Sequence, residues 1–391
     1  GVVTINYGTK VEIHMNEILG NEERFSVNYP NLYKDVKVGS SIVADDGYLT
    51  FKVDAIDEDK QIIYTTAHNT HTIKNKRGIN IPGIELQLDY ISEKDYEDLK
   101  WGCKNKVDFV AASFVRRKED IIAIRKVLEE AQCNDIQIIA KIENQEGVNN
   151  IKEILEVVDG VMVARGDLGV ELPPEEVPVV QKMLIRECRR SGKVVIVATQ
   201  MLESMQSNPK PTRAEVSDVA NAIFDSTDAV MLSGETAIGL YPIEAVKMQS
   251  IISRRMEENL DYRQLVDECY LHPHSTNDAI AFSVANTALL LSAKLIVAFS
   301  MTGGTSRRMS YYRPSCPIIS VTKDPDVIRR LCLNWGVYAY HNPQHMTTMD
   351  DFEKKAQEIA KYYRLQPNDR IILTGGDGEG NTNFMKIITV I

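Results

Sequence analysis

The chain has 391 residues, of which 43% are hydrophobic and 26% charged, and it carries a formal net charge of −10 at pH 7. These proportions are ordinary for a soluble globular protein of about two to four domains, and the acidic balance argues against nucleic acid as the main partner. No apolar run approaches the roughly 18 residues that cross a bilayer, and the six cysteines are scattered without a Cys-x-x-Cys pair, so we expect a cytoplasmic protein without disulfides or a zinc site.

The first 82 residues predict a small β domain. Short alternating or β-branched runs such as VEIHM, FSVNY and QIIYTTAH are interrupted by Gly, Asn, Asp and Pro, which is typical of consecutive short strands. The pattern closes at KNKRGINIPG, residues 74–83. We therefore expect residues 1–82 to form a small β-barrel lid domain.

From residue 83 the pattern changes to alternating strands and helices. The expected helix over residues 91–104 begins with a capping box, in which Ser92 is followed three residues later by Asp95. Apolar strands are expected to begin near Asp108, Asp135, Gly160, Lys193 and Asp228, with amphipathic helices between them. Such βα units predict parallel strands with helical crossovers over residues 83–260. A second run of alternating strands and helices predicts a doubly wound α/β domain over residues 261–391.

Polar groups stand where the expected strands of the middle region end. In Ile138–Gly147, Lys141 and Glu143 are two residues apart, so both point to one face of a strand. A cation and a carboxylate at the end of a buried strand are costly unless they act or form a structural pair that seals a barrel mouth. Three further strands end in such clusters, at Val161–Gly169, Val194–Leu202 and Ala229–Ala237. This is how a (β/α) barrel builds an active site.

These four segments, in this order, resemble the pyruvate kinase family over essentially the whole chain. The long run PTRAEVSDVANAIFDSTDAVMLSGETA, Pro211–Ala237, is the most specific part of the resemblance. It implies a (β/α)₈ barrel carrying an inserted β domain and a C-terminal α/β regulatory domain. The implied activity is the glycolytic transfer of phosphate from phosphoenolpyruvate to ADP, giving pyruvate and ATP.

The expected barrel has five strands, whereas a closed barrel of this type has eight and about 250 residues. The family places three further strands before the inserted domain, and this chain starts inside that domain. We expect an omitted N-terminal segment, because an open five-stranded arc exposes two apolar edges. The alternative function is a truncated, non-catalytic relative that serves oligomer assembly or effector binding. Another phosphoenolpyruvate-handling metal barrel fits neither flanking domain.

The expected metal site uses the ends of two consecutive strands. Glu143 and Asp167 can hold one hard divalent cation, with water and substrate oxygens completing the octahedron. The resemblance assigns Mg²⁺ or Mn²⁺ to these two positions and also implies K⁺. The alternative is a pair of solvated or helix-capping acids.

The resemblance also implies roles for other groups at the same mouth. Lys141 would stabilise charge on the transferring phosphoryl group. Thr199 would contact substrate and take part in protonating the enolate through water, unless its hydroxyl only bonds a backbone carbonyl. Gly166 and Asp167 offer backbone N–H groups at a helix N-terminus to a small carboxylate. Direct substrate contact and a structural role remain equally open for Arg165.

Four more residues have open roles. Ser233 and Glu235 end the last barrel strand, where a proton relay and a structural role are both compatible with the sequence. Lys76 and Arg77 lie where the β domain rejoins the barrel, so a closing lid would bring them to the phosphates of ADP or ATP. A solvated basic turn is the alternative for them.

The C-terminal region carries the expected regulatory site. FSMTGGTSRR forms a strand, a glycine-containing loop and a helix start, and such donors bind phosphate. The resemblance places an activating phosphorylated effector there, opposite the loop at Gly375–Asn383, and implies a homotetramer. A loop that only caps its helix is the alternative. The expected effector-binding residues are Ser300, Thr302, Gly304, Thr305 and Ser306.

Overall fold

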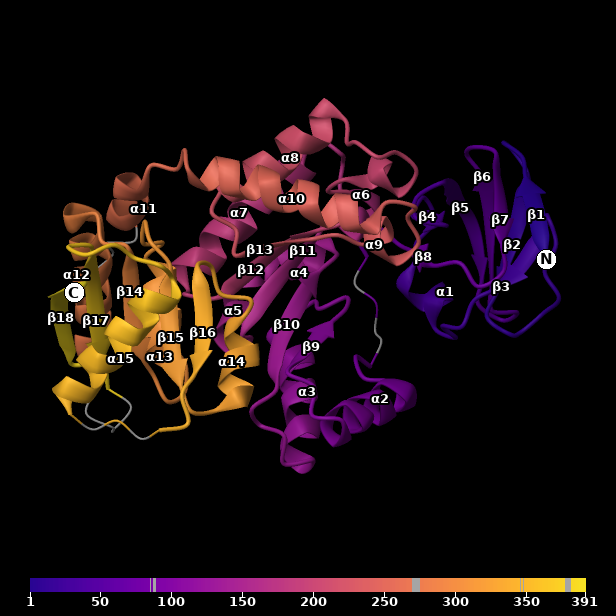
Figure 1. The fold of residues 1–391 in the computed structure, drawn as a ribbon. Coiled ribbons are helices and arrows are strands. Elements are labelled where there is room, and N and C mark those ends of the chain that lie inside the picture. The colour runs from indigo at the N-terminus through magenta and orange to yellow at the C-terminus, as the bar shows by residue number, and fades with distance from the viewer. Residues whose placement is uncertain (85, 87–88, 269–274, 345, 347, 377–380) are drawn as a thin grey trace.

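The computed structural model describes residues 1–391 apart from 85, 87–88, 269–274, 345, 347 and 377–380. Figure 1 shows three parts in a row: an all-β part at the N-terminus, a curved sheet with helices in the middle, and an α/β part at the C-terminus. No described helix is long and apolar enough to cross a membrane.

The N-terminal part is a β structure with a core of its own. Its described strands form a six-stranded sheet, in the order β3-β2-β6-β5-β4-β8, and an antiparallel β1–β7 ribbon. Ile13, Phe51 and Ile63 point inward and are fully buried, as the alternating sequence predicts. The elements are β1 (Val2–Ile5), β2 (Lys10–His14), β3 (Arg24–Ser26), α1 (Leu32–Asp35), β4 (Ser41–Ala44), β5 (Leu49–Asp57), β6 (Ile62–Ala67), β7 (His71–Lys74) and β8 (Ile79–Asn80).

The middle part is a curved parallel sheet whose described strands lie in the order β13-β12-β11-β10-β9, which is also their order along the chain. All four pairings are parallel, so the expectation of consecutive βα units is confirmed. The strands are β9 (Phe109–Ala112), β10 (Gln137–Ile142), β11 (Gly160–Ala164), β12 (Val194–Ala198) and β13 (Ala229–Met231).

The helices of this part cover the outer face of the sheet or follow the carboxyl-terminal ends of its strands. They are α2 (Glu93–Lys104), α3 (Lys118–Glu130), α4 (Gln145–Asn149), α5 (Ile151–Val157), α6 (Arg165–Glu171), α7 (Val177–Arg190), η1 (Glu203–Gln206), α8 (Arg213–Phe224), α9 (Gly234–Ala237) and α10 (Pro242–Glu257). The expected capping box of Ser92 and Asp95 begins α2, and Thr212 and Glu215 form another at α8. These side chains bond N–H groups that have no partner within the helix.

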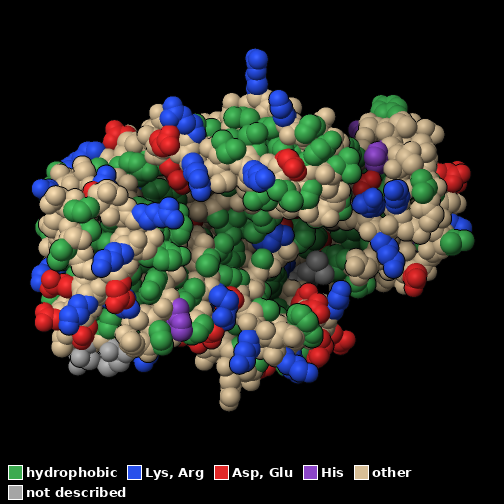
Figure 2. Space-filling model, in the orientation of Figure 1, with side chains coloured by type: hydrophobic (Ala, Val, Ile, Leu, Met, Phe, Trp, Pro, Cys, Tyr) green, Lys and Arg blue, Asp and Glu red, His purple; other side chains and the backbone are tan. Residues whose placement is uncertain are grey.

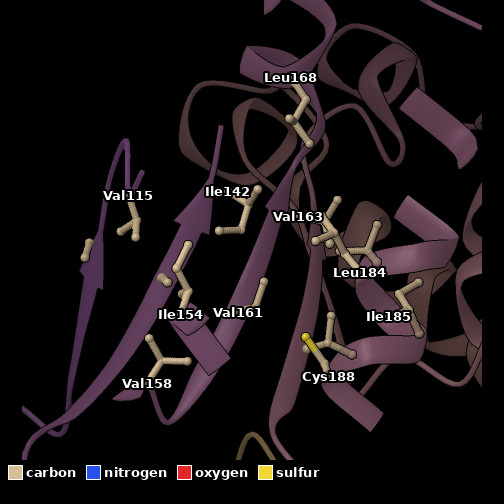
Figure 3. Close-up of a cluster of buried hydrophobic side chains, with 14 of the residues drawn as sticks. Val115, Ile142, Ile154, Val158, Val161, Val163, Leu168, Leu184, Ile185 and Cys188 are labelled. Atoms are coloured by element: carbon tan, nitrogen blue, oxygen red, sulfur yellow. The ribbon is translucent and has the colours of Figure 1, made fainter. Parts of the chain in front are cut away.

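Both faces of the central strands are buried, but they meet different neighbours. Figure 3 shows Ile142, Val161 and Val163 packed with side chains from the helices, including Ile154 and Leu184. Ile139, Met162 and Ile196 form a smaller cluster on the opposite, inner face. Because side chains alternate along a strand, Lys141 shares the inner face with Ile139.

The two edges of the described sheet are β9 and β13. A cavity of about 1060 Å³ lies against β9 and is lined by Val110, Ala112 and residues of α2 such as Leu99. Figure 2 shows hydrophobic side chains lining the hollow in the middle part of the molecule.

The C-terminal part is a second sheet with helices on both faces. Its described strands lie in the order β16-β15-β14-β17-β18, and all pairs are parallel except β17 with β18. Helices α12 and α13 pack on one face and α15 on the other. The elements are α11 (Tyr262–Glu268), α12 (Thr276–Leu291), β14 (Leu295–Phe299), α13 (Gly304–Tyr311), β15 (Ile318–Thr322), α14 (Pro325–Leu331), β16 (Val337–His341), α15 (Met349–Tyr362), β17 (Arg370–Gly375) and β18 (Phe384–Thr389).

Arginines of the C-terminal part contact acids at the N-terminal ends of the central strands. Arg313 forms a buried ion pair of 2.9 Å with Asp228, and Arg329 pairs with Asp108 at 2.8 Å. The Arg313 guanidinium also lies over the Trp335 ring. These contacts leave the opposite, carboxyl-terminal ends of the strands for the polar clusters.

Candidate active site

A buried carboxylate and a lysine stand together at the end of β10. Lys141 Nζ lies 2.6 Å from Glu143 Oε1 and 2.8 Å from Ser113 Oγ, which follows β9. Glu143 Oε2 accepts the backbone N–H of Phe114 at 2.5 Å. The Glu143 side chain is 1% exposed and that of Lys141 25%. The ammonium group is therefore fixed between two oxygens and still faces the open side of the sheet.

Glu143 is a carboxyl group held in an unfavourable environment. Burial raises the pKa of Glu143 above its ordinary value, and the nearby Asp167 carboxylate adds to this rise. Lys141 and the Phe114 N–H oppose the shift because they favour the charged form. A further cation close to Glu143 would stabilise its charged form in the same way.

The residues present fit a divalent cation that keeps part of its water. Asp167 lies in the first turn of α6, directly after β11, so it follows the strand that pairs with β10. Within the part of the chain that the structure describes, no group of three or more His, Cys, Asp and Glu side chains comes together. Two carboxylates with solvent and substrate oxygens suit Mg²⁺, which is commonly bound by one or two carboxylates.

Thr199 follows β12 in an unusual backbone conformation. Its φ is 67°, and that of Gln200 is 55°, so two consecutive non-glycine residues are left-handed. The Thr199 hydroxyl donates to Ala198 O at 2.6 Å and accepts from Gly166 N at 2.8 Å. The backbone-carbonyl bond that the sequence left open is therefore present, and the Gly166 N–H already has a partner.

Arg165 extends across the loop after β12. Its Nε donates to Ala198 O at 3.2 Å and its Nη2 to Thr199 O at 2.6 Å. Its Nη1 forms an ion pair of 2.7 Å with Asp218 on α8. Arg165 thereby pairs with a carboxylate and also bonds the loop that carries Thr199.

Glu235 is fully buried and bonds the two ends of neighbouring loops. Its Oε1 accepts Leu202 N at 3.0 Å and its Oε2 accepts Ser233 N at 2.8 Å. The backbone around Ser233 and the loop after Thr199 are thus tied by one carboxylate. Neither oxygen of Glu235 lies at the surface, and each accepts a backbone N–H group.

The basic pair of the β part lies near its junction with the middle part. Arg77 Nε pairs with Asp45 at 3.2 Å within the same part, and Lys76 is exposed with a φ of 59°. The two parts meet where Asn80 donates to Glu171 at the end of α6. Burial raises the pKa of Glu171, which the bonds from Asn80 and the Gly83 backbone partly offset.

The loop before α13 has both exposed groups and groups engaged in hydrogen bonds. Ser306 is fully buried and donates to Ser320 at 2.6 Å, while Thr305 and Thr382 are 2.8 Å apart. Thr302 is exposed, and Gly304 begins the helix after a left-handed Gly303. Ser300 is buried directly after β14. Of the facing loop at Gly375–Asn383, residues 377–380 lie outside the described residues.

Two residues of the site were missed from the sequence. Ser113 holds Lys141, and its signal was available because VAASF is another apolar strand that ends in small polar residues. Asp218 holds Arg165 from a helix, where an acidic residue on an amphipathic pattern reads as solvated surface. Only the packing of α8 beside the strand ends gives it this contact.

Comparison with known proteins gives a consistent result. Residues 1–246 match the family described as "Pyruvate kinase, barrel domain", and residues 278–388 match "Pyruvate kinase, alpha/beta domain". The chain is 50% identical over 392 residues to a pyruvate kinase of Geobacillus stearothermophilus and 49% identical over 393 residues to one of Bacillus licheniformis. These alignments cover 99% and 100% of this chain and 67% of each relative. A crystal structure of a pyruvate kinase from Cryptosporidium parvum superimposes with a TM-score of 0.93 at 37% identity, over 100% of this chain and 80% of that one.

Proposed function

The chain belongs to the pyruvate kinase family of phosphotransferases, and we propose that the groups at the carboxyl ends of β9 to β13 carry out its phosphoryl transfer from phosphoenolpyruvate to ADP. The observation that carries this proposal is Lys141, whose ammonium is held between Ser113 and the buried Glu143 at an open strand end. Phosphoryl transfer depends mainly on positioning and on neutralising charge, and both are present there.

Lys141 acts on the transferring group. Its compact ammonium faces the open side of the sheet, where it neutralises charge on the phosphoryl oxygens. Ser113 and Glu143 fix its position, so little reorganisation is needed when substrate binds. Bound Mg²⁺ or Mn²⁺, held by Glu143 and Asp167, would supply further positive charge for the phosphoryl oxygens.

Thr199 serves the second half of the reaction, in which the enolate receives a proton. Its hydroxyl lies beside the start of α6, because Gly166 N donates to it at 2.8 Å. A proton passes to the enolate from a water that this hydroxyl orients. Gly166 and Asp167 border the place of the substrate carboxylate, and Glu235, which bonds the backbone of Ser233 and Leu202, supports the loop that carries Thr199.

The N-terminal β part works as a lid over the nucleotide. Arg77 pairs with the Asp45 carboxylate at 3.2 Å, and its side chain is 43% exposed. When the lid closes, Lys76 and Arg77 exchange such contacts for phosphates of ADP or ATP.

These proposed roles divide the chain into a lid at 1–82, a catalytic part at 83–260 and a regulatory part at 261–391.

The oligomer, a homotetramer by family resemblance, forms through the apolar face of α10. Ile243, Val246 and Ile251 are 62%, 52% and 60% exposed, and Ile238 and Leu240 before the helix are 79% and 74% exposed. Hydrophobic side chains gather over α10 in Figure 2. Large exposed apolar side chains gathered in this way are typical of a surface that packs against other protein.

A phosphorylated metabolite acts on the regulatory part through the loop before α13. Exposed Thr302 and the N–H groups at Gly304 and Thr305 are the donors for its phosphate. The hydroxyls of Thr305 and Ser306 reach a ligand only by leaving Thr382 and Ser320.

We further propose that the protein acts in the cytoplasm and that K⁺ serves as a second cation.

Titration with Mn²⁺ tests the metal site directly. Wild-type protein should bind one Mn²⁺ per chain, and the affinity should rise when phosphoenolpyruvate is present. Asp167→Asn and Glu143→Gln should each weaken binding, whereas Glu187→Gln, on the outer helix α7, should not. Equal affinities in all four proteins would remove these two carboxylates from the proposed site.

A further inference from the structure

We propose that Arg165 is a positioning residue that holds Thr199 in its left-handed backbone conformation. The inference rests on the proposed role of Thr199 in protonating the enolate. It concerns a residue for which the sequence left substrate contact and loop support equally open.

The conformation of Thr199 requires support from outside its own segment. Thr199 has a φ of 67° and Gln200 one of 55°. A β-branched residue is rarely left-handed, and such strain persists only where the surrounding structure over-determines it. Two consecutive residues of this kind directly after a buried strand therefore need partners in addition to the bond that the Thr199 hydroxyl makes to Ala198 O within the loop.

Arg165 supplies these partners through one edge of its planar guanidinium, the edge formed by Nε and Nη2. Nε bonds Ala198 O at 3.2 Å and Nη2 bonds Thr199 O at 2.6 Å, so two consecutive carbonyls are fixed by one rigid group. The orientation of the guanidinium is set in turn by Asp218 at 2.7 Å from Nη1.

The same contacts leave no Arg165 nitrogen for the substrate. Nη1 also reaches Gln181 Oε1 at 3.4 Å, and Nη2 lies 2.9 Å from Met201 Sδ. Each of the three nitrogens thus has a protein partner, and the side chain is only 12% exposed. An arginine that bound a substrate carboxylate would keep at least one edge of its fork open.

The consequence for Thr199 is a fixed hydroxyl. With Ala198 O and Thr199 O held by Arg165, the Thr199 Oγ1 is placed to accept Gly166 N and to donate to Ala198 O. Further along the loop, the buried Glu235 accepts Leu202 N at 3.0 Å. The loop is therefore held at both ends, by Arg165 before and by Glu235 after the left-handed pair.

The test combines Arg165→Lys, Thr199→Ala and the double variant in the full-length protein. The first readout is exchange of the pyruvate methyl protons with D₂O, followed by NMR, because it reports enolate protonation in reverse. The second is kcat and KM for phosphoenolpyruvate. Since a lysine cannot bond both carbonyls, Arg165→Lys should slow exchange by roughly 10²-fold, at the low end for loss of acid–base catalysis.

If Arg165 acts only through Thr199, the double variant exchanges no more slowly than Thr199→Ala alone. KM for phosphoenolpyruvate should change by less than about threefold, because uniform substrate binding is untouched. Asp218→Asn, which releases the guanidinium without touching the loop, should cause a smaller loss in the same direction. Arg186→Lys on the exposed side of α7 is the matched control and should behave as wild type.

Losses that multiply in the double variant, or a raised KM with unchanged kcat, would show that Arg165 contacts substrate and would overturn the inference. If Thr199→Ala exchanges protons normally, the proposed role of Thr199 is wrong, and a crystal structure of Arg165→Lys then decides the positioning role. A Thr199 that keeps its positive φ in that variant refutes it, and one that relaxes supports it.

Discussion

Replacing Lys141 with Met should damage catalysis and stability for separate reasons. The substitution keeps the length of the side chain but removes an ammonium that lies 2.6 Å from Glu143 and 2.8 Å from Ser113. Removing one fixed electrostatic donor typically costs about 10²–10³ in kcat, or roughly 3–4 kcal/mol of barrier. We expect a loss in kcat of at least this size and a far smaller change in KM for phosphoenolpyruvate.

The stability effect follows from the carboxylate left behind. Breaking a buried pair costs about 3–5 kcal/mol, and the low end applies because Lys141 is 25% exposed and Glu143 keeps the Phe114 N–H. Lys182→Met is the matched control, since Lys182 is 58% exposed in its pair with Asp225 and should cost at most about 1 kcal/mol with normal turnover.

Steady-state kinetics and urea denaturation on the same samples separate the two effects. Activity is measured well below the denaturation midpoint, so that every chain is folded. A folded Lys141→Met protein with near-normal kcat would refute the role of the ammonium. A loss carried by KM alone would place Lys141 in substrate binding rather than in the transition state.

Three further results follow from the structure. Loss of a group that supports a metal ligand typically lowers metal affinity by about 10–100-fold. Glu143→Gln should therefore weaken Mn²⁺ binding by at least about tenfold, and an unchanged Mn²⁺ titration would contradict the role of Glu143 as a ligand. Burial raises the folded-state pKa of Glu171, so the favourable contribution of this carboxyl is present below its unfolded-state pKa and is lost as the pH rises. Glu171→Gln should therefore raise Tm at pH 7, and this gain should vanish near pH 4. A difference in Tm between variant and wild type that does not change with pH would contradict the raised pKa of Glu171. Thr302→Ala should weaken binding of a phosphorylated effector. It should also reduce the coupling free energy between effector and phosphoenolpyruvate binding, which is typically about 1–3 kcal/mol. Equal effector affinities of the wild type and the variant in calorimetry would show that this loop does not bind the effector.

The order of the strands and the places where they end could be predicted because each strand is marked by a pattern in its own short stretch of sequence. Each central strand is a short apolar run closed by Ser, Thr or a charged residue, and β9 to β13 begin within two residues of the predicted starts. Lys141 and Glu143 were recognised by their spacing of two, which places both on one face of a strand. The family resemblance then supplied roles that the spacing alone leaves open.

Contacts between segments distant in the chain could not be predicted. Arg165 and Asp218 are 53 residues apart, and Glu235 and Leu202 are 33 apart, so no local pattern connects them. The left-handed Thr199 is equally hidden, because a β-branched residue after a strand predicts continued extended backbone. The engaged hydroxyls of Thr305 and Ser306 appear free in the sequence, and only the packing of β15 and the segment at Thr382 occupies them.

Phosphoryl transfer by the site around Lys141 is the central activity proposed for this protein. Phosphorus NMR of the full-length protein with phosphoenolpyruvate, ADP and Mg²⁺ measures this transfer without coupling enzymes. We predict that the phosphoenolpyruvate signal falls as the γ-phosphate signal of ATP rises in equal amount, and that Lys141→Met slows both changes alike. A folded wild-type protein that forms no ATP, or a Lys141→Met variant that forms it at the wild-type rate, would contradict the account.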